Sequence, residues 1–271
     1  MSNLRPNAKP HRGMGMEGTV ACWYAALTKR SMEDFKSLAS RTAGQIPQTS
    51  RVLEVAPGPG YFAIELAKLG NYAITGLDIS ETFVEIARTN AARAGVWVDF
   101  RRGDASRMPF ADESFDFLLC RAAFKNFSEP KRALAEMYRV LKPGGRALII
   151  DLRRDASTES IDQAIKAMHI GAVNRIVTKL TFRYMLLKRA YTKGEFEELV
   201  SQTKFQHSEI CENPIGLEIL LSKGHPDFLS WAYFTLHGAS FQKSEPSCEL
   251  SPRRAIAQTT TPGNAPIPAS R

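Results

Sequence analysis

The sequence contains few cysteines and no long apolar run. Four of its 271 residues are cysteine, they lie far apart, and none forms a C-x-x-C pair. We therefore expect free thiols rather than a disulfide framework or a zinc knuckle. The longest apolar stretches, such as residues 115–120 and 147–150, are far shorter than the roughly 20 residues that span a bilayer. No transmembrane helix is expected.

The first eighteen residues lack the apolar core of a secretory signal, although they carry Arg5, Lys9 and Arg12. A cytoplasmic location is therefore expected. The five histidines show no metal-ligand spacing, and no metal site is predicted.

Acidic residues are outnumbered, and the pI is about 9.4 with a net charge of +8. The excess is local: residues 1–15 and 243–271 together hold +5, residues 153–193 hold +6, and the rest of the chain holds −3. A basic protein is often a nucleic-acid binder. Here the rest of the chain is mildly acidic, which weakens the interpretation of the protein as a nucleic-acid binder.

Composition divides the chain into a central domain and two tails. Residues 1–15 and 243–271 are rich in proline and polar residues, and we predict that both are disordered. The domain is predicted to cover residues 16–242, with N-terminal lid helices in residues 16–49, a cap insertion at residues 153–193 and an aromatic helix at residues 224–242.

Short β-branched runs alternate with runs of helical period, which is typical of a parallel sheet covered by helices. The predicted strands are residues 51–56, 72–78, 97–101, 115–120, 146–152, 207–212 and 216–222, the last two joined as a hairpin. The predicted helices are residues 61–69, 81–94, 129–141 and 193–202, with Ser80 and Ser128 as N-caps of the second and third. The run Lys142-Pro143-Gly144-Gly145 is expected to end the preceding helix before the fifth strand begins.

The loop after the first strand is the most informative segment. It reads Ala56-Pro57-Gly58-Pro59-Gly60 and leads into a helix, and glycines at such a turn let the backbone approach a ligand closely. The spacing also satisfies a dinucleotide fingerprint, with Asp78 twenty residues after Gly58. The two prolines, however, remove amides that would bind a pyrophosphate. Glu54 would repel a phosphate and attract a cation, so the loop favours a cationic cofactor.

At this point the chain resembles the class I S-adenosylmethionine-dependent methyltransferases, particularly those that methylate small molecules. The resemblance covers about residues 50–222. It rests on Glu54-x-x-x-Gly58-x-Gly60, Gly76-Leu77-Asp78-Ile79-Ser80, Gly103-Asp104-Ala105, the segment from Met108 to Asp116, and Arg139-Val140-Leu141-Lys142-Pro143-Gly144-Gly145. Ala56 departs from the family, which usually has its first glycine there. The resemblance implies an α/β, doubly wound, Rossmann-like sheet of seven strands in the order 3-2-1-4-5-7-6, with a helical cap.

The resemblance also implies how S-adenosylmethionine is held. Asp78 would accept hydrogen bonds from both ribose hydroxyls, and Asp104, beside the backbone of Ala105, would accept one from the adenine amino group. Ile79 and Met108 would enclose the adenine. The backbone carbonyl of Arg121 would meet the methionine ammonium, near which Glu54 would act electrostatically.

Methyl transfer is an in-line displacement that depends mainly on alignment, so a dedicated base is not required. The acceptor is expected to border residues 121–127, which lack the Asp/Asn-Pro-Pro-Tyr/Phe sequence of many amino-methylating enzymes. Cys120 ends an apolar strand and is interpreted as buried rather than nucleophilic. His169 is the first candidate base, and Tyr24 and Tyr191 are weaker ones.

Two further segments have open interpretations. In the insertion, Val173, Val177, Leu180, Tyr184 and Leu187 form one helical stripe, and Arg175, Lys179 and Arg183 form another. The basic stripe is either a solvated surface or a contact for an acidic substrate or for membrane headgroups. The aromatic residues 228–241 indicate core packing, a dimer contact or a substrate contact.

The predicted function is methyl transfer from S-adenosylmethionine to a small-molecule acceptor. The alternatives are an RNA methyltransferase and a cofactor-binding protein without catalysis. A homodimer is also considered.

Overall fold

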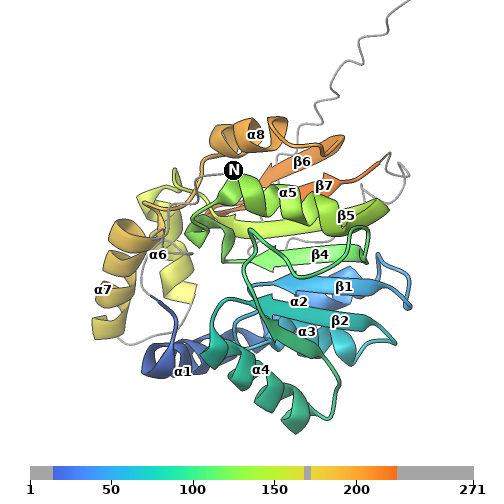
Figure 1. The fold of residues 1–271 in the computed structure, drawn as a ribbon. Coiled ribbons are helices and arrows are strands. Elements are labelled where there is room, and N and C mark those ends of the chain that lie inside the picture. Colours follow the sequence, from blue (N-terminus) through green and yellow to red (C-terminus); the bar gives the residue numbers. More distant parts are fainter. Residues whose placement is uncertain (1–14, 168–171, 225–271) are drawn as a thin grey trace, which may run out of the picture.

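The computed structural model describes residues 15–167 and 172–224, and Figure 1 shows their arrangement. The seven strands are β1 (Arg51–Val55), β2 (Ala73–Asp78), β3 (Asp99–Arg102), β4 (Phe115–Arg121), β5 (Leu141–Leu152), β6 (His207–Glu212) and β7 (Gly216–Ser222). They form one sheet in the order β3-β2-β1-β4-β5-β7-β6, in which β7 runs antiparallel to β5 and β6 and the other neighbouring pairs are parallel. The predicted fold and strand order are confirmed.

Helices cover both faces of this sheet. The helices are α1 (Gly18–Thr28), α2 (Met32–Ala43), α3 (Tyr61–Ala67), α4 (Glu81–Ala94), α5 (Pro130–Val140), α6 (Thr158–Ala167), α7 (Ala172–Thr181) and α8 (Lys193–Ser201), with short turns of helix at η1 (Lys29–Ser31), η2 (Phe124–Asn126) and η3 (Phe182–Leu186). One core cluster joins α2, α3 and α4 to the sheet, and a second joins α5 and α8 to its other face.

The alternation of side chains along β1 divides these two cores. Val52 belongs to the α2–α4 side, whereas Leu53 and Val55 belong to the α5–α8 side. Because successive strand residues point to opposite faces, Glu54 lies on the same face as Val52. Its carboxylate is therefore directed toward the start of α3.

The carboxyl ends of the parallel strands meet at one edge of the sheet. Figure 1 shows α1, α6 and α7 at this end of the molecule. Ligands of open α/β sheets bind at this edge. Within the described residues, every helix is too short or too polar to cross a membrane.

The predicted start and N-cap of α5 are wrong. The helix predicted from residue 129 begins at Pro130, and Glu129 rather than Ser128 occupies the N-cap position, with no side-chain cap bond. A residue before proline is disfavoured in helical conformation, so the proline fixes the start of α5. By contrast, Ser80 caps α4 as predicted, and its Oγ accepts a hydrogen bond from the Phe83 amide at 3.0 Å.

The proline-glycine run before the fifth strand is part of that strand rather than a stop. β5 begins at Leu141, opposite Phe115, but Arg146 already lies opposite Phe117. The extra residues form an irregular bulge, in which Gly144 has a φ of 79°. The turn chemistry predicted from the sequence is therefore present, but it forms a bulge inside the strand.

The insertion differs in detail from the predicted single amphipathic helix. α7 continues into η3, one turn of π-helix over Phe182–Leu186. Leu187 packs with Ile161 and Ile165 in a small core, whereas Leu180 and Tyr184 are exposed. Of the residues predicted to share one helical face, Leu187 therefore lies in a core whereas Leu180 and Tyr184 do not.

Candidate functional site

The loop between β1 and α3 has a left-handed backbone at alternate residues. Ala56, Gly58 and Gly60 have φ values of 56°, 54° and 78°. The first of these is the position where the resembling family has glycine, and a non-glycine residue there costs about 1 to 2 kcal/mol. The Ala56 amide donates to the Leu77 carbonyl at 2.8 Å, so the loop keeps its connection to β2 despite the alanine.

The two glycines of this loop have different surroundings. A Cβ on Gly60 would lie 2.6 Å from Cζ of Phe100, so close packing of the loop requires glycine there. A Cβ on Gly58 would meet no atom within 4 Å. The backbone at Gly58 therefore faces open space that a ligand can occupy.

Asp78 ends β2 and holds this loop in place. Its two carboxylate oxygens accept hydrogen bonds from the amides of Gly58 and Ser80, each at 2.9 Å. Burial raises its pKa to about 6, although the amides of Ser80, Gly58 and Ile79 oppose the shift. Since each carboxylate oxygen accepts more than one hydrogen bond, Asp78 retains capacity for the two ribose hydroxyls.

Glu54 is a second buried carboxylate at the same edge. Its Oε2 accepts a hydrogen bond from the amide of Ala63, in the first turn of α3, at 3.1 Å. Burial raises its pKa to about 8; the Ala63 amide and Arg121 lower it, and Asp78 raises it further. A cationic ligand beside this carboxyl would favour its ionised form, as the predicted methionine end of the cofactor requires.

The residues predicted to hold the adenine follow β2 and β3. The amide of Gly103 donates to the Asp78 carbonyl at 2.8 Å, which places Asp104 beside the end of β2. Asp104 Oδ1 accepts from the Ser106 amide at 2.7 Å. Met108 is buried, and Ile79 and Ala105 are partly buried. Asp104 therefore has a turn-forming role, and its second oxygen remains for a ligand.

Arg121 and Tyr24 meet at the end of β4. The guanidinium of Arg121 lies over the ring of Phe35 at 4.3 Å. Burial raises the pKa of the Tyr24 phenol; Arg121 lowers it, and Asp151 and Asp78 raise it. Tyr24 of α1 therefore lies within electrostatic range of the ends of β2, β4 and β5. At neutral pH its phenol is therefore protonated.

The first turn of α1 is fastened to the start of α4. Glu17 accepts hydrogen bonds from the amides of Glu81 and Thr82, each at 3.1 Å, and from the Thr82 hydroxyl at 2.6 Å. The Ser80 hydroxyl donates to the Met16 carbonyl at 2.6 Å. Further along, Tyr61 donates to the Ala25 carbonyl at 3.0 Å. These bonds hold the predicted lid beside the loop that contains Gly58.

Sequence reasoning missed a buried ion pair between η2, which follows β4, and the end of β5. Nζ of Lys125, in η2, lies 2.7 Å from Oδ1 of Asp151 in β5, and both side chains are almost fully buried. The Lys125 amide donates to the other Asp151 oxygen at 2.8 Å, and its Nζ donates to the Ala122 carbonyl at 2.6 Å. The pair fixes residues 122–125 against the end of β5. Its only sequence signal was a lysine in the loop after the fourth strand.

Besides Tyr24, the candidate bases are His169 and Tyr191. His169 lies outside the described residues. The ring of Tyr191 packs against Phe124 and Phe196, each at 5.9 Å between centroids, so it contributes to the core next to the acceptor loop. Cys120 is fully buried, and burial raises the pKa of its thiol well above the usual value. A nucleophilic thiolate at Cys120 is therefore disfavoured, as expected.

Comparison with known proteins bears on this geometry. Residues 53–149 match the model of a family described as "Methyltransferase domain". The chain is 34% identical over 179 residues to a demethylmenaquinone methyltransferase of Renibacterium salmoninarum, and the match covers 62% of this chain and 73% of the relative. The chain belongs to the class I S-adenosylmethionine-dependent methyltransferases. S-adenosylmethionine, the predicted cofactor, and the predicted enzyme class are confirmed.

Another relative matches over less of its length. The demethylmenaquinone methyltransferase of Deinococcus radiodurans is 42% identical over 108 residues, which is 40% of this chain. The chain spans 45% of the length of that relative.

Solved structures agree on the fold. A Methanococcus maripaludis protein assigned to the S-adenosyl-L-methionine-dependent methyltransferases aligns with a TM-score of 0.65 at 19% identity, covering 82% of this methyltransferase and all of that chain. A SAM-dependent methyltransferase from Aquifex aeolicus aligns with a TM-score of 0.54 at 18% identity, covering 69% and 88% of the two chains.

Proposed function

We propose that this methyltransferase acts on a small, largely apolar acceptor with a ring, such as a quinol. The observation that carries the proposal is the character of the wall beyond β4. Phe127 and Tyr191, both partly buried, pack there on the fully buried Phe124, next to the buried pair of Lys125 and Asp151. The names of the relatives, demethylmenaquinone methyltransferases, support the same class of acceptor.

The residues present fit the cofactor. The open space at Gly58 admits it, and the two buried carboxylates of Glu54 and Asp78 lie where a cation and a ribose would need them. We assign the ribose hydroxyls to Asp78, the adenine amino group to Asp104, the adenine faces to Ile79 and Met108, and the ammonium to the Arg121 carbonyl and Glu54. When bound, S-adenosylmethionine supplies an electrophilic methyl group on a sulfonium.

The protein's part in the reaction is then alignment and exclusion of water. The loop fixed by Lys125 and Asp151 borders the acceptor, and α1 covers the cofactor side with Tyr24. The phenol of Tyr24 would donate a hydrogen bond to an acceptor oxygen and so orient the ring. His169 remains our candidate for removal of the acceptor proton, and Tyr191, a member of the aromatic wall, is a weaker candidate.

Labelled S-adenosylmethionine tests this proposal directly. The protein would be incubated in parallel with a reduced demethylnaphthoquinone, a pool of bacterial metabolites and structured RNA. We expect label in the quinol and release of S-adenosylhomocysteine. Label only in RNA would contradict the proposal and favour the RNA methyltransferase, and cofactor binding without turnover of any acceptor would favour a non-catalytic protein.

A cytoplasmic location and a homodimer stay predictions. Fractionation of cells tests the first, and light scattering of the full-length protein at several concentrations tests the second.

A further inference from the structure

Large apolar side chains are exposed on α7 and η3. Ile176, Leu180, Tyr184 and Met185 are exposed by 63, 51, 55 and 43%. The first three are four residues apart and so lie along one side of the helix. We call these four residues the apolar stripe. Apolar patches on a protein surface commonly mark a site of interaction.

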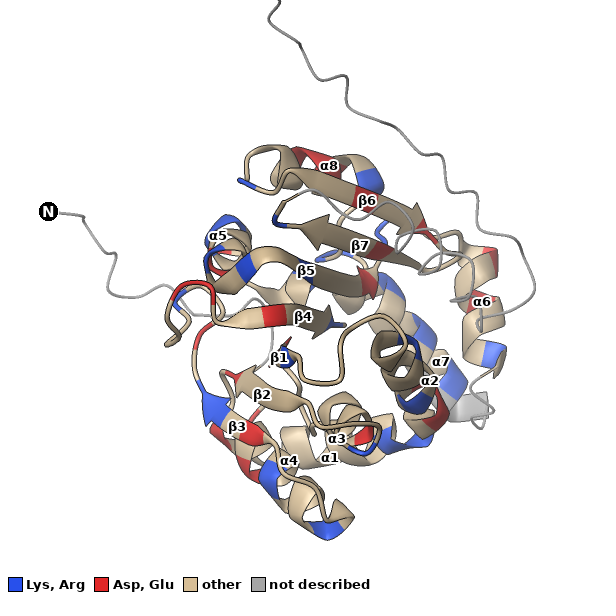
Figure 2. Cartoon of the chain, turned by 90° about the vertical axis from the view of Figure 1, so that its right-hand side faces the viewer, with Lys and Arg blue, Asp and Glu red and all other residues tan. Residues whose placement is uncertain are grey.

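A basic stripe runs beside the apolar one. Arg175, Lys179 and Arg183 each precede a member of the apolar stripe by one residue, and residues 172–189 contain five Lys or Arg and no Asp or Glu. Figure 2 shows these basic residues along α7. Lys179 pairs with Asp162 of α6 at 2.7 Å. Within residues 15–167 and 172–224, Arg175 and Arg183 form no ion pair, so both charges remain for a partner.

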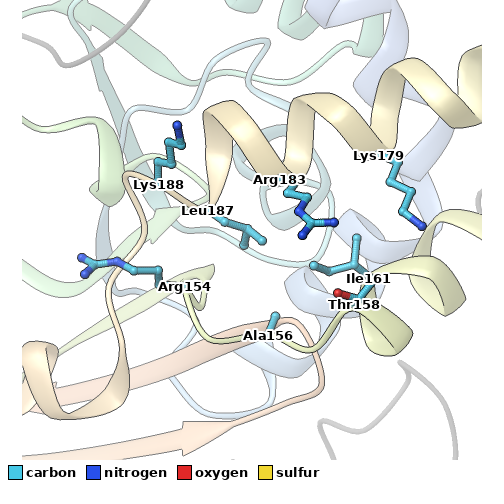
Figure 3. A pocket seen from close by; sticks show the side chains of 8 residues that line it. All are labelled: Arg154, Ala156, Thr158, Ile161, Lys179, Arg183, Leu187 and Lys188. Carbon is cyan, nitrogen blue, oxygen red and sulfur yellow. The ribbon is translucent and has the colours of Figure 1, made fainter.

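A pocket of about 290 Å³ opens between η3, α6 and the loop after β5 (Figure 3). Its basic lining residues are Arg154, Lys179, Arg183 and Lys188, and the rest are Ala156, Thr158, Ile161 and Leu187. Figure 3 shows the Arg183 side chain extending toward Thr158, the first residue of α6. Anions bind favourably at a helix N-terminus and beside arginine. The pocket lies at the small end of the range for ligand sites and suits a phosphate group.

We propose that α7 and η3 dock this protein onto an anionic phospholipid surface. A helix with apolar and basic residues side by side lies in the plane of the interface, with its apolar side chains among the acyl chains and its cations at the headgroups. The pocket would then receive a headgroup phosphate. An acidic small molecule would use the pocket and the basic stripe, but it would leave the apolar stripe without a role.

The position of the cap gives this docking a consequence for access. α7 lies at the end of the molecule where the parallel strands terminate (Figure 1), and α1 exposes Trp23 and Leu27 at the same end. Docking by α7 would bring the carboxyl ends of the parallel strands, where the cofactor loop lies, close to the lipid surface. The proposal does not depend on the identity of the acceptor, because binding to lipid is measured without turnover.

Vesicle sedimentation tests the proposal with the full-length protein. The vesicles consist of phosphatidylcholine with or without phosphatidylglycerol. We expect sedimentation with the anionic vesicles only, because a basic residue near an anionic surface contributes roughly a fivefold gain in partitioning. The charge variant Arg175→Gln/Arg183→Gln should lower the partition coefficient by about tenfold or more. The apolar variant Ile176→Ser/Leu180→Ser should lower it as well, without loss of cofactor affinity.

Matched variants outside the cap serve as controls. Arg93→Gln/Lys131→Gln removes the same charge from α4 and α5, and Trp97→Ser removes a side chain that is 86% exposed away from the cap. Both should sediment like the unaltered protein. Equal sedimentation with both kinds of vesicle, absence of sedimentation, or an equal loss in the controls would overturn the proposal. A charge variant that loses binding while the apolar variant keeps it would also overturn docking, because the lipid surface would then act as a polyanion only.

Discussion

At the scale of single residues, the cofactor site is organised by two buried carboxylates with different tasks. Asp78 joins the glycine loop to the end of β2 through the Gly58 and Ser80 amides, whereas Glu54 meets the first turn of α3. Both carboxyls have a raised pKa because burial disfavours their charged forms. In the cofactor-free protein, burial therefore disfavours the ionised form of each carboxyl, and a ligand that donates hydrogen bonds or carries positive charge would stabilise that form.

Replacing Asp78 tests the ribose assignment. Asp78→Ala should weaken S-adenosylhomocysteine binding by about 1.5 to 3 kcal/mol, the usual range for hydrogen bonds to a charged acceptor. Titration calorimetry measures this loss, and circular dichroism checks the fold. Asp78→Asn keeps the shape but places an NH2 group opposite the Gly58 or the Ser80 amide, so it should weaken binding as well. An unchanged affinity in a folded Asp78→Ala protein would refute the assignment.

Glu54 makes stability depend on pH in an unusual direction. Its pKa rises from 4.5 to about 8 on folding, so the native state holds a proton that the unfolded chain releases. The stability from this proton is complete below pH 4.5 and is lost as the pH rises toward 8. Glu54→Gln cannot ionise, and it should therefore unfold at a higher temperature than the unaltered cofactor-free protein above pH 8.

The same titration should appear in cofactor affinity. Because a sulfonium favours the ionised carboxylate, affinity for S-adenosylmethionine should increase as the pH rises toward 8, and the increase should be absent in Glu54→Gln. Glu85→Gln, on the exposed side of α4, controls for the loss of a carboxyl. A parallel pH profile for Glu54→Gln and the unaltered protein would contradict this role.

At the scale of elements, α1 depends on a few hydrogen bonds to α4. Glu17→Ala removes the three that its carboxylate accepts from Glu81 and Thr82. A carboxylate near a helix N-terminus contributes about 0.3 to 1 kcal/mol, so we expect little global destabilisation. Hydrogen exchange of residues 18–28 should accelerate while β1 and β4 stay protected. Glu33→Ala, on the exposed side of α2, provides the control, and equal exchange in both variants would show that Glu17 does not hold the lid.

The sequence predicted elements best where one local signal decided the matter. Ser80 caps α4 because a serine hydroxyl reaches the amide three residues on, and the helical pattern that follows it is regular. At Ser128 the same signal was present, but Pro130 decided the start of α5. In β5 the local turn chemistry of Gly144 was correct, yet pairing with β4 and β7 continued through it. Long-range pairing is not visible in a local pattern.

Prediction of the site had a similar limit. Glu54, Gly58 and Asp78 were found because family motifs and turn chemistry mark them in the sequence. Lys125 and Asp151 lie 26 residues apart and meet only because β4 and β5 are neighbours. Tyr24 was proposed as a weaker candidate base, and its electrostatic interaction with Arg121 depends on how α1 packs on α4.

At the scale of the whole molecule, the ends of the chain are predicted to be dispensable for cofactor binding. A fragment of residues 16–242 should bind S-adenosylhomocysteine with the affinity of the full chain, because the sheet and the glycine loop lie within it. Its boundary keeps Met16 and Glu17, which contact the start of α4. Calorimetry on both proteins makes the comparison. A fragment that folds but fails to bind would assign an ordered role to one of the tails.

The strand order also affects the protein while it is being synthesised. β1 lies between β2 and β4, yet β4 begins sixty residues after β1 ends. On the ribosome, the apolar β1 can pair with β2 but has one open side until Phe115–Arg121 emerges. An unpaired apolar strand edge recruits other chains. The nascent chain therefore passes through a stage in which it needs protection from aggregation, and the cofactor cannot shorten that stage, since its site also requires β4.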